Sequence, residues 1–197
     1  MRPRSGFRAA TRWAIEPHST TVAPPMNPPL AARRQPGSAL CFVCGTQNPH
    51  GFGLQFFDDG KTVWTELTAA EHHQGWPGVL HGGIIAAVLD ETIGRVAFLH
   101  DRWVHTARLV MRYVKPAPLG EPLRATGELT RDARLLMEMK GRLVRVSSGE
   151  VLAEATGTFV PLPDETRNAL ARKLGGDFSV WEQWLAENRV ADPASNL

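Results

Sequence analysis

The sequence lacks three features that would each point to a particular class of protein. It has only two cysteines in 197 residues, which excludes a disulfide framework and fits a reducing compartment such as the cytoplasm. Its formal net charge is +2, too small for a protein that binds nucleic acid. No apolar run approaches the ~20 residues of a membrane-spanning helix. We therefore expect a soluble globular protein with neither nucleic-acid nor membrane partners.

Basic charge and proline are concentrated at the start of the chain. Residues 1–38 hold six Arg against a single acid, and seven of the 15 prolines. Proline disfavours helices and the segment has few large apolar side chains to bury, so we expect a disordered tail. This composition is also typical of an organellar transit peptide, and Met26 is an alternative start. The rest divides into a domain over residues 39–163 and a helical C-terminal extension over 164–197, in which 178–185 is amphipathic.

The domain combines short strand patterns with one longer helical pattern. Strands are expected at 52–56 and 61–67, joined by the turn residues Asp58-Asp59-Gly60. Apolar residues recur at helical spacing over 82–99. Four further strand patterns follow, at 104–114, 121–131, 135–146 and 151–161. One long helix among antiparallel strands predicts an α+β domain whose sheet curls around the helix.

The expected helix has two very different faces. One is an apolar stripe that should pack on the sheet, made of Ile85, Leu89, Ile93 and Val96. The other consists of small residues and one carboxylate, namely Gly83, Ala86, Ala87, Asp90, Gly94 and Ala97. Another helix or a ligand should cover this second stripe, and a covered carboxylate needs a partner or a catalytic purpose. The structural alternative for Asp90 is a hydrogen bond across a dimer seam.

Gly82 and Gly83 open the helix directly after His81. Backbone N–H groups of a first helical turn have no intrahelical partner, so these can donate to a carbonyl oxygen that develops negative charge. The alternative is a tight turn that requires glycine, and His81 either orients a substrate or caps the turn. Gly82 and Asp90 lie roughly 12 Å apart along one helix, too far to act on one carbonyl group. Two antiparallel copies of the helix can meet that need, so the sequence predicts a homodimer with shared sites.

Three motifs occur in order along the domain. They are Cys41-Phe-Val-Cys-Gly-Thr-Gln-Asn-Pro-His-Gly51, then His81-Gly-Gly with Leu89-Asp90 and Gly94, then Tyr113-Val-Lys-Pro-Ala-Pro-Leu-Gly120. Together they resemble the hotdog-fold acyl-CoA thioesterases of the phenylacetate-degradation type, over about residues 40–162. The resemblance implies an antiparallel sheet wrapped around a central helix, assembled as a homodimer and often as a dimer of dimers. It also implies hydrolysis of acyl-CoA without a metal or a redox cofactor.

The resemblance assigns roles to particular residues. Asp90 matches the acid that serves the family as general base or nucleophile, and Gly82 matches the glycine whose N–H polarises the thioester carbonyl. His81 matches the histidine before that glycine, and Thr106 aligns with a threonine that serves the site in mammalian-type members. Some branches use glutamate, which keeps Glu91 as a weak substitute for Asp90.

Other candidates for substrate binding rest on weaker patterns. Arg108, Arg112 and Lys115 lie on or just after one expected strand and are candidates for the phosphates of CoA, with solvated strand charges as the alternative. Because side chains alternate along a strand, Arg108 and Arg112 should share a face with Thr106. Gly83 and Glu91 are also candidates for contact with the substrate.

Two features close to the expected site have structural interpretations. Glu91 precedes Arg95 by four residues, which predicts an ion pair on the helix surface. Cys41-x-x-Cys44 resembles half of a zinc knuckle, but the second pair of ligands is missing, so no metal site is predicted. The alternative is that histidines complete the ligand set, for which the candidates are His50, His72, His73 and His81. We expect instead a loop folded over the edge of the domain, with buried thiols.

Two rival functions fit parts of the pattern. A non-catalytic acyl-CoA sensor would use the same fold, but Asp90 in the catalytic position argues against it. A hotdog dehydratase acting on acyl thioesters would pair a histidine with an acid, whereas the match through Gly82 and Asp90 favours hydrolysis. The identity of the acyl group, and whether CoA or a carrier protein holds it, depend on the shape of the pocket.

Overall fold

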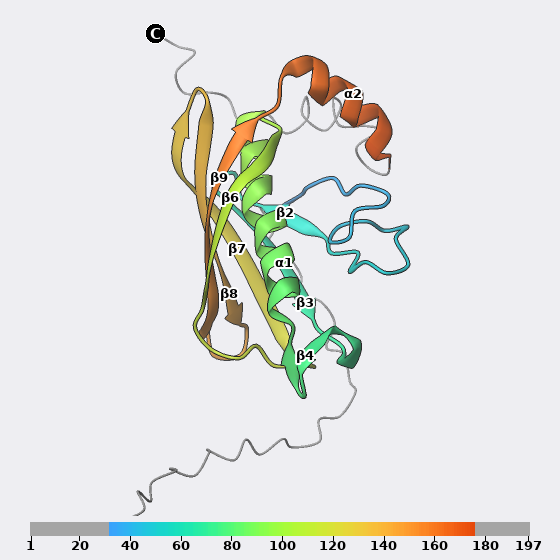
Figure 1. The fold of residues 1–197 in the computed structure, drawn as a ribbon, viewed down its shortest axis with the longest axis vertical. Coiled ribbons are helices and arrows are strands. Elements are labelled where there is room, and N and C mark those ends of the chain that lie inside the picture. The colour runs from blue at the N-terminus through green and yellow to red at the C-terminus, as the bar shows by residue number, and fades with distance from the viewer. Residues whose placement is uncertain (1–31, 176–197) are drawn as a thin grey trace, which may run out of the picture.

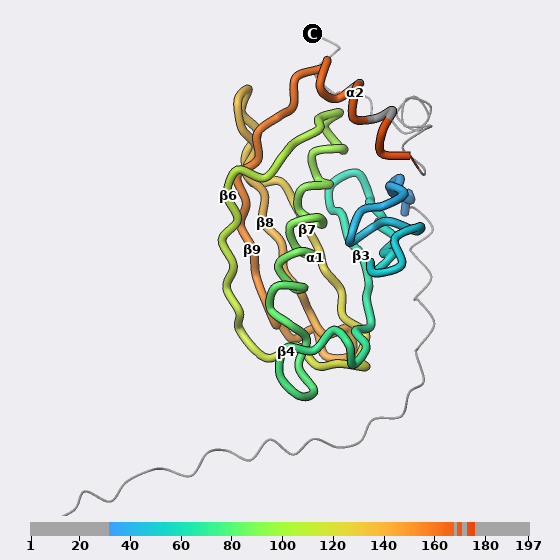
Figure 2. The backbone as a smooth tube through the Cα atoms, turned by 45° about the vertical axis from the view of Figure 1, so that its right-hand side comes forward, coloured from blue at the N-terminus to red at the C-terminus, as the bar shows by residue number. Residues whose placement is uncertain are grey.

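The computed structural model describes residues 32–175, shown in colour in Figures 1 and 2. Most of the basic tail and the amphipathic stretch 178–185 lie outside these residues. Within them, no helix is long and apolar enough to cross a membrane. The extension predicted from residue 164 begins with helix α2 (Asp164–Leu174).

One antiparallel sheet forms the body of the domain. Its strand order is β1-β2-β3-β7-β8-β9-β6, so β6 lies at one edge. The strands are β1 (Arg33–Arg34), β2 (Phe56–Asp58), β3 (Thr62–Thr68), β6 (Val104–Tyr113), β7 (Pro122–Ala133), β8 (Leu136–Arg145) and β9 (Val151–Pro161). A separate two-stranded ribbon joins β4 (Gln74–Trp76) to β5 (Val79–Leu80), after the short 3-10 helix Glu71–His73.

The sheet curves around helix α1 (Gly82–Gly94), as Figures 1 and 2 show from two directions. The predicted apolar stripe is confirmed, because all four of its residues are buried against the sheet: Ile85, Leu89, Ile93 and Val96. Two paired glycines, Gly127 on β7 and Gly141 on β8, let the helix approach the sheet closely at Ile93. The predicted α+β architecture, a sheet wrapped around one central helix, is thus confirmed.

Three predicted boundaries differ from the structure. The helical segment changes at Arg95 into a 3-10 helix (Arg95–His100), which ends at Asp101 in the left-handed conformation. The strand predicted over 52–56 begins only at Phe56, because the backbone of residues 52–54 bonds to the loop at residues 42–43 instead. The predicted end of the tail at residue 38 falls inside the folded part.

The last residues of the predicted tail pack against the domain through polar contacts. Arg33 in β1 forms an ion pair with the buried Asp58 of β2, which also accepts a hydrogen bond from Gln35 at 3.2 Å. The Pro36 carbonyl accepts a hydrogen bond from the Arg95 guanidinium at 2.9 Å. Composition alone hides these contacts, because each partner lies more than 20 residues further along the chain.

Candidate active site

The central feature of the site is a contact between helix α1 and edge strand β6. The Thr106 hydroxyl donates a hydrogen bond to Oδ1 of Asp90 over 2.9 Å. Oδ2 of the same carboxylate has no hydrogen-bond partner among residues 32–175. Both residues line an open hollow whose walls also include Gly94, Phe98, Val104 and Phe159. The structure therefore brings together the two predicted catalytic residues of this end of the helix.

Partial burial changes the acidity of Asp90. Removal of the carboxylate from water raises its pKa above the ordinary value of 3.8. The hydrogen bond from Thr106 acts in the opposite direction, and the neighbouring Glu91 charge raises the pKa further. A carboxylate with a raised pKa is a stronger base, which is the property that proton abstraction from water requires.

A β-bulge in β6 decides which residues accompany Thr106. The register of β6 on β9 shifts between Thr106 and Arg108, so the alternation of side chains is interrupted. After the bulge Leu109 and Met111 pack on the core, which leaves Arg108 and Arg112 on the other face of the sheet. The prediction that these arginines share a face with Thr106 is wrong. It assumed strict alternation of side chains, whereas the bulge inserts one extra residue and reverses the faces beyond it.

Two of the three cations proposed for CoA phosphates already have carboxylate partners. Arg112 forms an ion pair with Glu154 on the neighbouring strand β9, and Lys115 with Glu150. Arg108 is exposed. To bind a phosphate of CoA, Arg112 or Lys115 would have to exchange its carboxylate partner for that phosphate.

The opposite end of α1 holds the predicted donor. His81 is the N-cap of the helix, and its Nδ1 accepts a hydrogen bond from the Gly83 N–H over 2.9 Å. The Gly83 N–H is therefore occupied, whereas the Gly82 N–H has no partner among the described residues. Of the two alternatives for His81, the structure places it as a cap. Gly82 remains the residue of this turn whose N–H can donate to a ligand.

Tyr113 is a residue of this turn to which sequence reasoning gave no role. Its hydroxyl donates to the Gly82 carbonyl over 2.8 Å, and its ring lies against the position where a Gly82 side chain would begin. The signal that could have drawn attention to it is its place in the third motif, as the single tyrosine of the chain.

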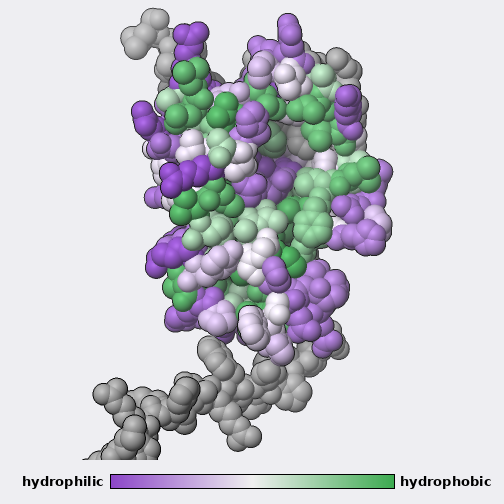
Figure 3. Space-filling view, viewed as in Figure 1, coloured by the Kyte–Doolittle hydropathy of each residue, from purple (hydrophilic) through white to green (hydrophobic). Residues whose placement is uncertain are grey.

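Gly82 and Asp90 belong to opposite ends of one rigid helix. Their separation along α1 is roughly 12 Å, so one chain does not place both beside the same carbonyl group. The small residues on this side of the helix are accessible: Gly83 is exposed, and Ala86, Ala87 and Gly94 are partly exposed. Ala97 is buried, because the segment has already turned into the 3-10 helix. Figure 3 shows this side of the molecule, where apolar and near-neutral residues occupy much of the centre.

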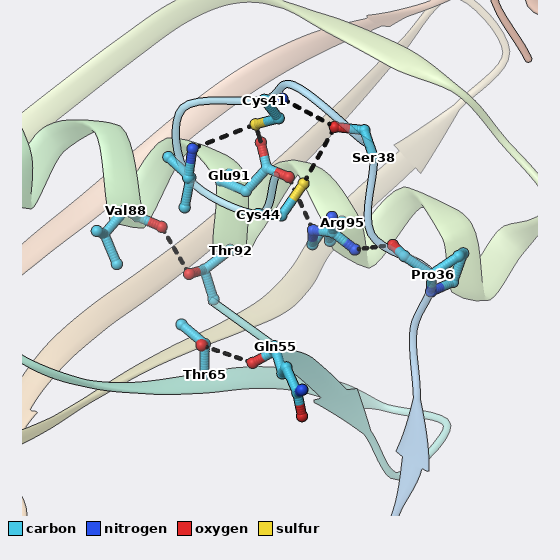
Figure 4. Close-up of polar contacts among 11 residues, drawn as sticks. Pro36, Ser38, Cys41, Cys44, Gln55, Thr65, Val88, Glu91, Thr92 and Arg95 are labelled. Carbon is cyan, nitrogen blue, oxygen red and sulfur yellow. Dashed lines mark hydrogen bonds and ion pairs between the residues drawn. The ribbon is translucent and has the colours of Figure 1, made fainter. Parts of the chain in front are cut away.

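Glu91 faces a different environment from its neighbour Asp90. It forms the predicted ion pair with Arg95, Nε to Oε1 at 2.9 Å. The pair does not lie on the surface, since Arg95 is only 3% exposed and its guanidinium lies over the Phe56 ring at 4.2 Å. The loop that contains Cys41 and Cys44 covers it, as Figure 4 shows. Glu91 is thus engaged by Arg95 and the loop, although it lines the same hollow as Asp90 and Thr106.

The sequence is similar to a known family model and to several curated proteins. Residues 77–152 match the family model described as the thioesterase superfamily. Similar curated proteins include acyl-coenzyme A thioesterase THEM4 of Bos taurus, 26% identical over 142 residues, which are 71% of this chain and 59% of that protein. THEM4 of Rattus norvegicus is 33% identical over 95 residues, 48% of this chain and 41% of that protein. The chain thus spans about half the length of the curated relatives it matches.

Solved structures share the arrangement of the sheet and helix. A protein described as a thioesterase superfamily protein is 32% identical, with a TM-score of 0.56 over 60% of this chain and 58% of its own. The E. coli PaaI protein from the phenylacetic acid degradation operon is 14% identical, with a TM-score of 0.53 over 57% of this chain and 81% of its own. The likeness to the E. coli protein concerns the fold alone.

Proposed function

We propose that this chain, whose residues 77–152 match the thioesterase superfamily model, hydrolyses acyl-CoA thioesters to the free acid and CoA. The observation that carries the proposal is the Asp90–Thr106 contact at the edge of an open, partly apolar hollow. Acyl-CoA as substrate is supported by the names of the curated THEM4 relatives. The length and type of acyl group that the enzyme prefers depend on the shape of the complete pocket.

Asp90 acts on the thioester carbonyl carbon. Its unpartnered Oδ2 takes a proton from a water molecule, whose oxygen adds to the carbonyl carbon, or attacks that carbon directly. Thr106 holds Oδ1, so that Oδ2 keeps a fixed direction. In the water route the C–S bond then breaks, Asp90 returns its proton to the sulfur, and the products are CoA as a thiol and the free carboxylic acid. In the direct route C–S cleavage expels the CoA thiolate, which takes a proton from solvent, and leaves an anhydride between the acyl group and Asp90. Water then hydrolyses this anhydride, which releases the carboxylic acid and restores Asp90.

The Gly82 N–H stabilises the negative charge that develops on the carbonyl oxygen. It is the free donor of the first turn of α1, at the positive end of the helix dipole. His81 holds the neighbouring Gly83 N–H, and Tyr113 holds the Gly82 carbonyl, so the turn is fixed before substrate binds. These two residues position the donor.

A second copy of the chain completes the site in this proposal. Gly82 of one subunit and Asp90 of the other approach one thioester when two α1 helices lie antiparallel. Two observations support such a homodimer. Strand β6 is an edge strand of ten residues with Val110 45% and Tyr113 52% exposed. The small residues of α1 also present no bulky side chain to a second helix. A dimer of dimers is the further assembly that we propose.

The proposal is tested by thiol release from short, medium, long and aromatic acyl-CoAs, with wild type, Asp90→Asn and Asp164→Asn compared. Asp164 is an exposed acid at the start of α2, so its variant controls for the loss of one carboxylate. We expect turnover by wild type and the control, and a loss of at least ~10²-fold in a correctly assembled Asp90→Asn protein. Equal turnover by wild type and Asp90→Asn would contradict the proposed role.

The same panel separates hydrolysis from the rival functions when a 3-hydroxyacyl-CoA and a measurement of the melting temperature are added to it. A chain that released no thiol but melted at a higher temperature with acyl-CoA would be a sensor. Consumption of a 3-hydroxyacyl-CoA with no thiol release would indicate dehydration. We also propose a cytoplasmic location, which rests on the low cysteine content of the sequence.

A further inference from the structure

The loop before β2 brings two thiols onto the far side of α1 from Thr106. Sγ of Cys41, Sγ of Cys44 and a carboxylate oxygen of Glu91 all lie within 4.8 Å of one another. Cys44 is buried, and Cys41 and Glu91 are half-buried. Figure 4 shows both sulfurs pointing toward the same carboxylate, with Ser38 and Arg95 beside them.

We propose that Cys41, Cys44 and Glu91 bind one thiophilic divalent cation, of which Zn²⁺ is the expected ion, and that this ion fastens the loop to α1. Zinc is bound by thiolate and carboxylate ligands at about 2.3 and 2.0 Å, which separates tetrahedral ligand atoms by roughly 3.5 to 3.8 Å. Cys41 Sγ lies 3.8 Å from Oε2 of Glu91. Small side-chain movements would therefore complete the three-ligand geometry.

The surroundings of the cluster match those of a metal ligand set. The Val43 N–H points at Cys41 Sγ over 3.3 Å, and backbone donation of this kind stabilises a thiolate. Arg95 holds Oε1 of Glu91 and leaves Oε2 directed at the sulfurs, the outer-shell arrangement that orients a ligating carboxylate. Two thiolates and one carboxylate would balance a divalent ion together with the Arg95 cation. The buried centre would then be neutral, as a low-dielectric site requires.

The fourth position of a tetrahedral ion is left to a water molecule. A small cavity adjoins the cluster, and its lining includes Cys44, Arg95 and Gln35. Gln35 is 2% exposed, and its Oε1 has no hydrogen-bond donor among the described residues. A water molecule in this cavity is therefore a candidate both for the fourth ligand and for the donor to this oxygen.

The first test measures metal on the full-length protein, purified with reductant and without added metal. Elemental analysis should find about one zinc per chain in wild type and in Glu71→Gln, an exposed acid used as control, and background in Cys44→Ser. Replacement by Co²⁺ should give a sulfur-to-cobalt charge-transfer absorption that Cys44→Ser abolishes. Chelation should lower the melting temperature of wild type and leave that of Cys44→Ser unchanged.

A second measurement keeps the proposal open to contradiction if Cys44→Ser does not fold. Wild type is stripped with chelator, both thiols are shown to be reduced by thiol titration, and Zn²⁺ is added back. Protection of both thiols from alkylation and recovery of the melting temperature support the proposal. A reduced protein that takes up no Zn²⁺, or a chain whose thiols form a disulfide and bind no metal after reduction, overturns it. None of these readouts depends on thioesterase activity, so the two proposals fail independently.

Discussion

The Thr106 hydroxyl on edge strand β6 donates to the Asp90 carboxylate on central helix α1 over 2.9 Å. This contact joins the outermost strand of the sheet to the C-terminal half of the helix that the sheet surrounds. It fixes one carboxylate oxygen while the other has no partner among residues 32–175. A single hydrogen bond therefore both orients the proposed base and moderates its pKa.

Removal of the Thr106 hydroxyl should change the pH dependence of hydrolysis. In Thr106→Val, Asp90 loses a hydrogen bond that lowers its pKa, so the pKa rises further. A base acts only when ionised, so the acidic limb of the kcat/KM profile should move to higher pH. Activity on that limb should fall roughly tenfold, the equivalent of about 1.4 kcal/mol for a hydrogen bond to a charged group. Thr106→Ser should restore the wild-type profile, and an unshifted limb in the valine variant would contradict the role of this contact.

The Gly82 N–H can be deleted with little change to the backbone. Gly82 is the first residue of α1, a position that favours proline, and His81 already has the extended conformation that a following proline requires. Gly82→Pro should fold and lower kcat by about 10²- to 10³-fold, because it removes the donor to the carbonyl oxygen. Gly82→Ala keeps the N–H, and its added carbon would lie 3.4 Å from the Tyr113 ring, so it should lose less activity. Equal losses of activity in both variants would mean that the added side-chain atoms, and not the missing N–H, cause the loss.

Asp90 should lower the stability of the fold at neutral pH. Burial raises its pKa in the native state above the ordinary 3.8, so the unfolded chain releases the proton first as pH increases. The free energy of unfolding therefore falls as pH rises from about the ordinary value through the raised one. Asp90→Asn removes this penalty, and its melting temperature relative to wild type should increase from acidic to neutral pH. A constant difference across that range would argue against a raised pKa.

The close contact between α1 and the sheet should not tolerate a methyl group at Gly127. A carbon added there would lie 3.0 Å from both the Ile93 Cα and the Thr92 carbonyl oxygen, so the helix would have to move. Gly127→Ala should lower the free energy of unfolding by about 1 to 3 kcal/mol, measured by denaturant titration. Thr126→Ala, one residue earlier on β7, provides the control and should change it much less. Similar values for both would show that the helix adjusts freely.

The features best predicted from the sequence are those that depend on local periodicity. The buried stripe of α1 follows from apolar residues that recur every three to four positions. The strands from residue 104 onward follow from apolar residues that recur every second position. The family resemblance assigned Asp90 and Thr106 to one site, but their hydrogen bond was not predicted, since no local pattern joins residues that are 16 positions apart.

The features that sequence reasoning missed depend on contacts between distant segments. The bulge at Thr106 places Arg108 and Arg112 on the other face, and such an irregularity leaves no trace in an alternating pattern. Glu91 approaches Cys41 across 50 positions, so a search of the sequence for closely spaced ligands did not find it as a candidate third ligand. Packing of residues 33–38 likewise depends on distant partners at Asp58 and Arg95.

The most direct test of the shared site mixes two inactive variants. Gly82→Pro and Asp90→Asn are each expected to be nearly inactive, and they are combined in equal amounts under conditions that allow subunit exchange. If one subunit supplies the N–H and the other the carboxylate, each mixed dimer contains one site with both groups intact. Random pairing then restores about a quarter of the wild-type activity. A mixture that exchanges subunits, as shown by mass, yet remains as inactive as its components would contradict the account.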